Sequence, residues 1–337
     1  MAQPAGLYDT YDLTSIRGGG LRQSLSDMIY NVSPTDTPFL TMMSKVSAGS
    51  TIIEWQIDSL AAATTANTQA DGDDAVLTEP APTSQINNRT QIMTKNFGVS
   101  GTAQAIDKAG RANELGYQLS KRSAEIKRDL ESTLLNNQAS SVGTTVSGAG
   151  RTMGGLPAWL VSNDPGYAAG GADGGWSSTT NLVAACTDGT PQRAFTQALL
   201  DTAIQLTWQN GGKVPPYLLA GPKQRQIFSG FDGITSATTG QYHETDDFRI
   251  IGRADVYASN FGDMRVVPER FIRTAAASGA DREVFGVNPE YVQLAELRPF
   301  QEHELARTGD SEKRQLVWEG TLKMLNEAAH FKVPDLS

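Results

Sequence analysis

The three histidines are the first side chains to test for catalytic or metal-binding chemistry. His243, His303 and His330 are widely separated in the sequence. His303 is followed by Glu304, but the segment lacks the second histidine that places two zinc ligands on one helical face in a metalloprotease. We therefore predict isolated histidines, either hydrogen-bonded in the core or exposed at the surface, and no metal site.

Two glycine-containing segments match catalytic loops only in part. Residues 98–102 begin like the nucleophile turn of a hydrolase, but Thr102 stands where the final glycine is needed, and no helix is expected directly after it. In residues 148–155, Met153 replaces the third glycine of a dinucleotide-binding loop, and the Gly-Lys-Ser/Thr ending of a P-loop is missing. We interpret the first segment as a strand end and the second as a flexible turn.

The clustered acidic residues and the single cysteine are the remaining candidates for metal binding or catalysis. Asp71, Asp73 and Asp74 lack the alternating spacing of a calcium loop, so a solvated turn at a hairpin tip is predicted. Cys186 has no basic neighbour in the sequence that would lower the pKa of its thiol, which favours a small buried residue. We predict no catalytic residue, no cofactor and no bound metal.

The composition is that of a globular chain with a real core. Of 337 residues, 39% are hydrophobic, and a single cysteine excludes an internal disulfide. A net charge of -9 and a pI near 4.9 argue against nucleic-acid binding as the main task, because phosphates are neutralised by clustered lysines and arginines. No segment approaches the roughly 18–20 apolar residues of a membrane span, and residues 1–9 lack a secretory pattern. A soluble cytoplasmic product is expected.

A projecting hairpin is the first element that these patterns predict. In residues 51–58, Ile53, Trp55 and Ile57 alternate with polar residues, as in a half-buried strand. A second, mostly polar run spans residues 89–99, and about thirty residues with almost nothing to bury separate the two. A two-stranded ribbon is marginal in water by itself. The missing partner of this ribbon is therefore predicted to be another molecule.

A long helix is predicted over residues 113–138. Leu119, Ile126 and Leu130 lie on its apolar stripe and are expected to pack on a sheet as the core of the helix. The charged residues lie elsewhere on the helix and include pairs four residues apart, which are Lys121 with Glu125 and Lys127 with Glu131.

The other segments alternate between helices, loops and strands. Residues 139–189 are expected to form surface loops, and Thr190-Pro191 is expected to open a helix that ends at Gly211-Gly212. A buried strand is predicted at residues 216–220, with a helix from Gly221-Pro222. Further strands are predicted at residues 248–257, 264–267, 284–287, 291–298 and 315–325. Two short helices, in residues 21–30 and from Pro38, precede the hairpin, so the chain is expected to be α+β.

Several segments, in their order and spacing, resemble the major capsid (head) proteins of tailed double-stranded DNA phages. These segments are residues 27–39, 54–60, 125–131, 151–156, 305–310, 319–322 and 327–330. The resemblance extends through most of the chain and is weakest in residues 160–189. None of the matching segments is catalytic.

The resemblance implies the Hong Kong 97-type fold, with an N-terminal arm, an extended E-loop hairpin, a long spine helix, a P-domain and an A-domain. The implied function is a structural protein that self-assembles into hexamers and pentamers of an icosahedral head around viral double-stranded DNA. The expected location is the virion, after assembly in the host bacterial cytoplasm. The implied segments are the arm at 1–48, the E-loop hairpin at 49–102, the spine helix and part of the P-domain at 103–150, mainly the A-domain at 151–288, and the return strands of the P-domain with the C-terminus at 289–337.

In such shells the hairpin of one subunit lies across its neighbour. The candidate intersubunit contacts are Ile53, Trp55, Ile57, Arg89, Lys95, Phe97 and Arg128. Some relatives join subunits by a bond between a lysine and an asparagine. Lys95 and Lys108 are the lysines that could form such a bond, but no local pattern singles them out. A non-covalent shell is therefore favoured.

The resemblance also implies partners. They are further copies of the chain, a separate scaffolding protein and a portal. Whether an outer cement protein also binds is left open. A separate scaffold is expected because the hairpin is reached by about residue 50, without the long N-terminal extension of relatives that carry their own. The acidic subunit is expected to enclose DNA without sequence-specific binding and without membrane contact.

Two other classes of protein stay open at this point. A tail-tube or decoration protein would share the self-assembly, but tail tubes are mainly β, and the long charged helix argues against that architecture. A hydrolase would need a nucleophile, a base and an orienting group that converge, which the scattered histidines do not suggest.

Overall fold

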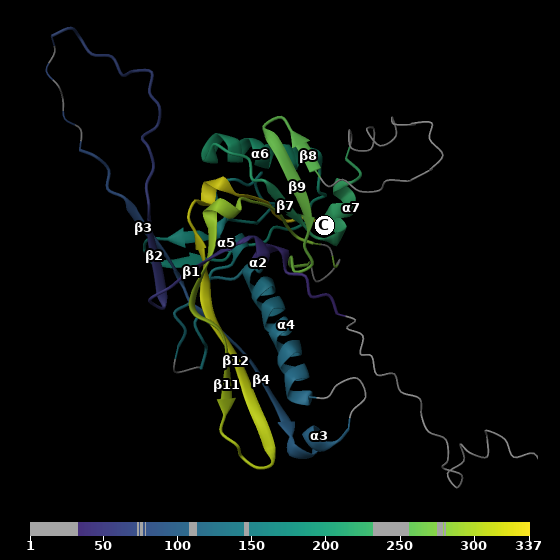
Figure 1. Ribbon diagram of the computed structural model, residues 1–337. Coiled ribbons are helices and arrows are strands. Elements are labelled where there is room, and N and C mark those ends of the chain that lie inside the picture. Colours follow the sequence, from purple (N-terminus) through teal and green to yellow (C-terminus); the bar gives the residue numbers. More distant parts are fainter. Residues whose placement is uncertain are drawn as a thin grey trace, which may run out of the picture.

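Two sheets, a long helix and a projecting hairpin make up the fold of the chain (Figure 1). The computed structural model describes residues 33–337 apart from 73, 75, 76, 78, 108–112, 145–147, 232–255, 275–278 and 280. The predicted helix in residues 21–30, Lys108, His243 and most of the predicted strand at 248–257 lie outside the described residues.

The first sheet has four strands in the order β1-β11-β12-β4. They are β1 (Ser44–Ser47), β11 (Val292–Leu305), β12 (Ser311–Met324) and β4 (Gln91–Ser100). β11 and β12 form a long antiparallel ribbon, β4 runs antiparallel to β12, and β1 runs parallel to β11. The ribbon and β4 extend to the lower end of the molecule, where α3 (Gly101–Ala105) follows β4 directly (Figure 1).

The long helix α4 (Glu114–Leu134) runs along this sheet, within the predicted range (Figure 1). Asn113 caps its first turn, because the Asn113 side chain accepts a hydrogen bond from the backbone N–H of Gly116 at 3.1 Å. Ile126 and Leu130 are at most 1% exposed, and Leu119 is partly buried against the same core. The amphipathic stripe therefore joins the helix to the sheet.

Short elements fill the space between this sheet and the upper part of the molecule. α5 (Leu156–Trp159) is buried along its whole length. The others are α2 (Pro38–Met42), β5 (Gly175–Ser177), β6 (Leu182–Ala184), and the 3-10 helices η1 (Pro289–Tyr291) and η2 (Glu327–Ala329).

The hairpin differs from the prediction in its second strand. β2 (Ile52–Ile57) pairs antiparallel with β3 (Ser84–Arg89), with Ile52 opposite Arg89 and Ile57 opposite Ser84. The predicted return strand at 89–99 is β4, which belongs to the four-stranded sheet. β3 escaped prediction because its buried side chains include Asn88, whose amide hydrogen-bonds Gly154 N–H at 2.9 Å and Leu322 C=O at 2.8 Å.

The second sheet has five strands in the order β13-β10-β7-β9-β8. They are β13 (Phe331–Val333), β10 (Val284–Val287), β7 (Tyr217–Ala220), β9 (Gly262–Pro268) and β8 (Val256–Ser259). α6 (Gln197–Gly211) and α7 (Pro222–Phe228) pack beside it around a second core. The predicted strand at 284–287 and the helix starting at Pro222 are confirmed.

The start of α6 corrects another prediction. Thr190-Pro191 is a cis peptide and lies before the helix instead of opening it. Thr196 is the cap, since its side chain accepts a hydrogen bond from the N–H of Leu199 at 3.4 Å. The predicted end at Gly212 is confirmed, with φ of 72°, a left-handed value that glycine adopts without strain.

Two of the predicted segments contain strands from different sheets. Residues 49–102 hold the hairpin β2–β3 and also β4 of the four-stranded sheet. Residues 289–337 hold β11 and β12, but also β13, which pairs with β10 in the five-stranded sheet. The last strand therefore does not return to the sheet beneath α4.

Candidate intersubunit surfaces

The loop between β2 and β3 projects far from the body of the molecule (Figure 1). Residues 58–83 contain five acidic residues and no lysine or arginine. Leu60 is 98% exposed and Leu77 is 95% exposed. Neither leucine is covered by its own chain.

The base of the hairpin is fixed to its own subunit. Trp55 is 8% exposed, and its ring centroid lies 5.6 Å from that of Trp159. Ile53 is partly buried against the same core, whereas Ile57 is 37% exposed. The Trp55 ring is therefore packed within its own chain.

Four other candidate contact residues also have positions within their own subunit. Phe97 is buried, and Arg89 at the end of β3 is half-buried. The Lys95 ammonium lies 2.6 Å from a carboxylate oxygen of Asp129 on α4. The guanidinium of Arg128 lies over the ring of Phe271, 5.7 Å from its centroid. Sequence alternation identified the strands but could not show that α4 and α5 cover these side chains.

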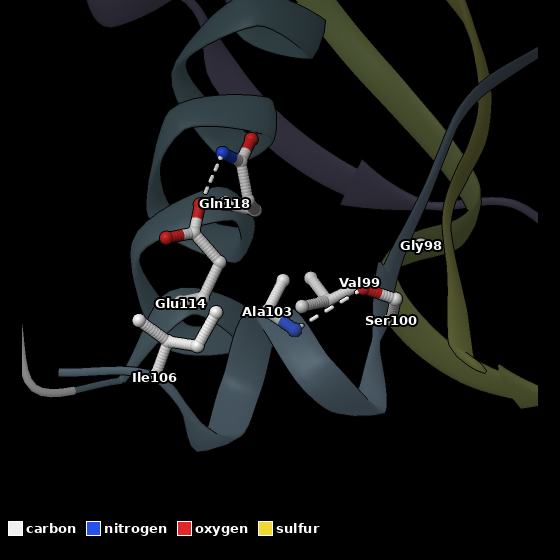
Figure 2. A pocket seen from close by; sticks show the side chains of 7 residues that line it. All are labelled: Gly98, Val99, Ser100, Ala103, Ile106, Glu114 and Gln118. Atoms are coloured by element: carbon white, nitrogen blue, oxygen red, sulfur yellow. Dashed lines mark hydrogen bonds between the residues drawn. The ribbon is translucent and has the colours of Figure 1, made fainter. Parts of the chain in front are cut away.

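A cavity lies at the lower end of the molecule, between the end of β4, α3 and the first turns of α4 (Figure 2). We call it the tip cavity; its volume is about 540 Å³, and its lining residues are Gly98, Val99, Ser100, Ala103, Ile106, Glu114 and Gln118. Val99, Ala103 and Ile106 give it an apolar wall, and Ile106 is 59% exposed. On the α4 side of the cavity, the Gln118 side-chain amide donates a hydrogen bond to the Glu114 carboxylate at 2.8 Å.

Ser100, in the segment that began like a hydrolase nucleophile turn, lines this cavity. A helix does begin directly after it, contrary to the prediction. The Ser100 hydroxyl accepts a hydrogen bond from Ala103 N–H at 3.2 Å and so caps α3. No histidine is among the residues described around the cavity.

Glu131 holds the N-terminal arm onto α4. The sequence predicted an exposed Glu131 paired with Lys127, but its side chain is fully buried, and its two oxygens accept hydrogen bonds from the N–H groups of Phe39 and Leu40, each at 2.7 Å. Burial, followed by the charge of the buried Glu269, raises the pKa of Glu131 to about 9. The carboxyl pair therefore keeps one proton at neutral pH. A lone glutamate on a helix carries no sequence signal for this role.

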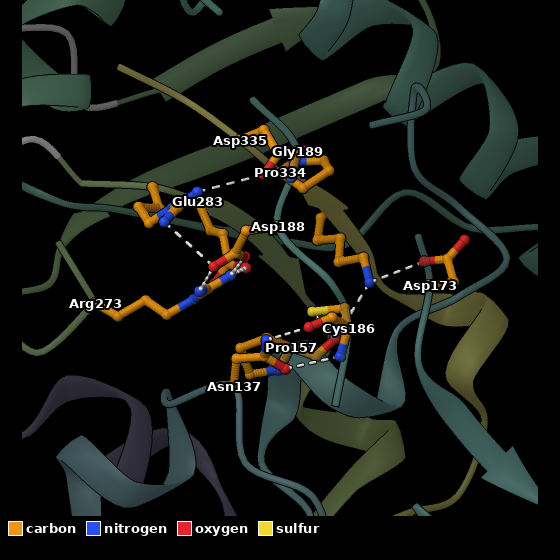
Figure 3. A network of polar contacts seen from close by, with 12 residues as sticks. Asn137, Pro157, Asp173, Cys186, Asp188, Gly189, Arg273, Glu283, Pro334 and Asp335 are labelled. Atoms are coloured by element: carbon orange, nitrogen blue, oxygen red, sulfur yellow. Dashed lines mark hydrogen bonds and ion pairs between the residues drawn. The ribbon is translucent and has the colours of Figure 1, made fainter. Parts of the chain in front are cut away.

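A polar network ties the loop around Cys186 to the end of the chain (Figure 3). Arg273 lies between Asp188, with N–O distances of 2.7 and 2.6 Å, and the buried Glu283. The buried Lys332 on β13 reaches Asp173 at 3.1 Å and the carbonyl of Pro157 at 3.2 Å. Burial raises the pKa of the Cys186 thiol, which keeps it protonated.

The described histidines have separate environments. His303 is exposed, and His330 is fully buried, where its Nδ1 accepts a hydrogen bond from the N–H of Asn288 at 3.1 Å. Among the described residues, no group of three or more His, Cys, Asp or Glu side chains could hold a metal ion. In the same part of the chain, no helix has both the length and the apolar character needed to cross a bilayer.

Acid is expected to destabilise the subunit through His330. Burial lowers the folded-state pKa of His330 to about 4, against an ordinary value of 6.5. Between these values the unfolded chain binds a proton that the folded chain does not, so stability falls as the pH falls. Glu131 makes a contribution of opposite sign over this range in every variant, so the readout is the difference from the wild type. From about pH 7 to pH 5, the free energy of unfolding measured in urea should change more favourably in His330→Asn than in the wild type. His303→Asn, at an exposed site, is the control, and an equal change in all three proteins would contradict the assignment.

A family model described as SU10 major capsid protein matches residues 6–337. The chain belongs to this family of major capsid proteins. It is 29% identical over 360 residues to the major capsid protein of Escherichia phage Phieco32, covering 98% of this chain and 96% of that protein. The resemblance seen in the sequence is thereby confirmed.

Solved structures with the same fold are also capsids or related shells. The capsid of cyanophage A-1(L) has a TM-score of 0.61 at 12% identity, covering 96% of this chain and 99% of that one. The capsid of an empty GTA particle has a TM-score of 0.60 at 12% identity, with the same coverage. The predicted Hong Kong 97-type α+β fold is therefore confirmed. This capsid protein forms the shell of the virion by association with further copies of itself.

Proposed function

We propose that this capsid protein assembles as hexamers and pentamers of an icosahedral head that encloses double-stranded DNA. The projecting loop at residues 58–83 carries the proposal, because its uncovered leucines need another subunit to be buried. The exposed Ile57 at the loop's base extends the same contact surface. In this arrangement α4 is the spine of the four-stranded P-domain sheet, and the five-stranded sheet is the centre of the A-domain.

The role proposed for the chain is structural and not enzymatic. The Ser100 hydroxyl caps a helix and the Cys186 thiol is buried and protonated, so neither is poised as a nucleophile. The net charge of -9 supports an inner wall that encloses DNA without gripping it in a sequence-specific way. A separate scaffolding protein and a portal complete the set of partners proposed from the family likeness, and an outer cement protein stays open.

Electron microscopy of the purified, overexpressed protein tests the proposal. Closed shells or rings of five and six subunits are expected. Hollow tubes would support a tail component instead, and uniform small particles at all concentrations would contradict self-assembly.

Shortening the projecting loop is expected to separate folding from assembly. Replacing residues 61–81 with a two-residue Asn-Gly turn leaves β2 and β3 paired and removes Leu77 from the projecting loop. Circular dichroism and urea unfolding should match the wild type, whereas closed shells should be lost in electron micrographs. Closed shells of normal size from the shortened protein would show that the loop makes no essential contact.

A further inference from the structure

We propose that Lys332 and Asp173 join in an amide bond within one chain, with Asp164 as the acid and base of the reaction. The bond connects β13 to the glycine-rich loop that precedes β5. It forms inside a single subunit and links no neighbouring copy. The inference therefore goes beyond the proposed assembly and does not depend on it.

Lys332 is held as a nucleophile against a single carboxyl group. Its side chain is fully buried, which is rare for a lysine. The Nζ atom lies 3.1 Å from Oδ1 of Asp173, 3.2 Å from the carbonyl oxygen of Pro157 and 5.1 Å from the centre of the Tyr167 ring (Figure 3). These contacts fix the nitrogen beside the carboxyl group of Asp173.

Two other lysines that pair with carboxylates lack this enclosure. The side chain of Lys45 is 52% exposed and that of Lys213 is 67% exposed, so water solvates both ammonium groups. Hydration favours the ionised form of an exposed pair, whereas burial brings the neutral amine and carboxylic acid closer in free energy to the ion pair. Transfer of one proton from Lys332 to Asp173 then gives the neutral amine that attacks a carbonyl carbon.

A second carboxyl group, that of Asp164, supplies the acid. Its Oδ1 accepts a hydrogen bond from the N–H of Gly166 at 2.7 Å, whereas its Oδ2 is buried and has no donor among the described residues. A buried carboxyl oxygen without a donor is stable when it carries a proton, and Asp173 is placed to accept that proton in a hydrogen bond. Burial, followed by the hydrogen bond with Asp173, raises the pKa of Asp164 to about 6. A fraction of chains therefore carries this proton at neutral pH.

The reaction consumes one amine and one carboxylic acid and gives one amide and one water. The lone pair of the Lys332 Nζ forms a bond to Cγ of Asp173, and the carbonyl electron pair moves onto its oxygen. When that pair returns, the C–O bond breaks, and Asp164 gives its proton to the departing hydroxyl group, which leaves as water. Asp164 then takes the extra proton from Nζ, so it ends as it began and nothing is oxidised or reduced.

Two features of the site favour the amide over the free groups. Holding the amine against the carboxyl group replaces an encounter in solution by a step within one molecule, which corresponds to effective concentrations of roughly 10⁵–10⁸ M. The Asp173 side chain is 32% exposed, so the released water has a path to solvent, while the side chain of Lys332 is closed off. Each chain reacts only once, so a slow reaction is sufficient.

Intact-mass measurement of the purified full-length protein under denaturing conditions tests the bond. Protein kept folded near pH 6 for several days should weigh less than its sequence mass by the mass of one water. Proteolysis should then release a peptide pair that joins Lys332 to Asp173. The full sequence mass, in protein that circular dichroism shows to be folded, would overturn the inference.

Lys332→Arg is the matched control. Arginine keeps a positive charge opposite Asp173 but has no amine that attacks, so this variant should keep its full sequence mass. Lys332→Met serves the same purpose if the buried site does not accommodate arginine. An aspartate followed by glycine, such as Asp173-Gly174, also loses water by closing a ring with the next backbone nitrogen. An equal loss of water in the Lys332 variants would therefore overturn the inference.

Two further substitutions separate the roles of the carboxyl groups. Asp173→Asn should reach the same final mass as the linked wild type, because the same amide forms and ammonia leaves instead of water. Asp164→Asn keeps a polar side chain but has no acidic proton. It should contain several-fold less of the linked peptide pair than wild-type protein of the same age, and an equal amount would overturn the role of Asp164.

Discussion

Replacing Trp55 with alanine is expected to lower the free energy of unfolding of the isolated subunit by about 3–5 kcal/mol. The ring packs against Trp159 and lies beneath the ammonium of Lys323, 5.9 Å from its centroid. Its loss leaves a cavity between the base of the hairpin and the buried helix α5. Urea unfolding of unassembled protein, followed by circular dichroism, measures the effect.

Trp208→Ala is the matched control for this prediction. Trp208 is 49% exposed on α6 and touches Phe261 with ring centroids 5.3 Å apart, so its loss should cost under about 1 kcal/mol. From sequence alternation alone, we would expect Trp55→Ala to destabilise the shell and leave the isolated subunit folded. Unfolding curves for Trp55→Ala that match the wild type would restore that interpretation and contradict the packing described above.

The second large effect is a loss of subunit stability at alkaline pH. The folded-state pKa of Glu131 is about 9, against an ordinary value of 4.5. Between these values the unfolded chain releases a proton that the folded chain keeps, so stability falls as the pH rises, by up to about 1.4 kcal/mol per pH unit. Below about pH 4.5 and above about pH 9, the contribution of Glu131 to the free energy of unfolding no longer changes with pH. From about pH 7 to pH 9 His330 is neutral in both states, so it does not contribute to this slope.

Glu131→Gln should remove this slope. An amide cannot ionise, and one amide oxygen still accepts a hydrogen bond from the arm, so the variant's stability should be nearly flat between about pH 7 and pH 9. Glu290→Gln is the control, because its side chain is 69% exposed and the slope should be retained. Glu269→Gln should reduce the slope as well, since it removes the neighbouring charge. Parallel pH profiles for the wild type and Glu131→Gln would rule out the proton-sharing pair.

Alkaline pH should also release the arm locally. Charged Glu131 and Glu269 repel each other within a buried site, which weakens the hold on Phe39 and Leu40. The other charged groups near this joint are Arg128 on α4 and the pair of Arg270 with Asp36, 3.7 Å apart. Hydrogen exchange in Pro38–Met42 should therefore accelerate before global unfolding.

The sequence predicted the elements whose side chains follow a simple period. The stripe through Ile126 and Leu130 predicted α4, and an apolar run predicted β10 with its boundaries. β3 was missed because its one aliphatic residue, Ile86, stands beside two buried asparagines. The amide of Asn88 is satisfied by backbone groups far along the chain, and no local pattern records such partners.

The sequence pattern says less about the surroundings of the candidate contact residues than about the fold. Alternation in β2 separated Trp55 from its polar neighbours correctly, but it could not distinguish a side chain that faces another subunit from one that faces α5 of its own. The tip cavity arises where β4, α3 and α4 meet, and these elements bring together residues that share no motif. The exposed leucines of the loop, by contrast, follow directly from a long polar segment with nothing to pack against.

The position of β13 has a consequence for synthesis in the cell. β13 is the edge strand next to β10, and Leu336 beyond it is fully buried in the second core. The five-stranded sheet therefore stays incomplete until these residues leave the ribosome, on the order of ten seconds after β7 at bacterial elongation rates. The hairpin, in contrast, joins strands only a short distance apart in the chain. A nascent subunit can therefore pair the strands of its hairpin before it can complete its five-stranded sheet.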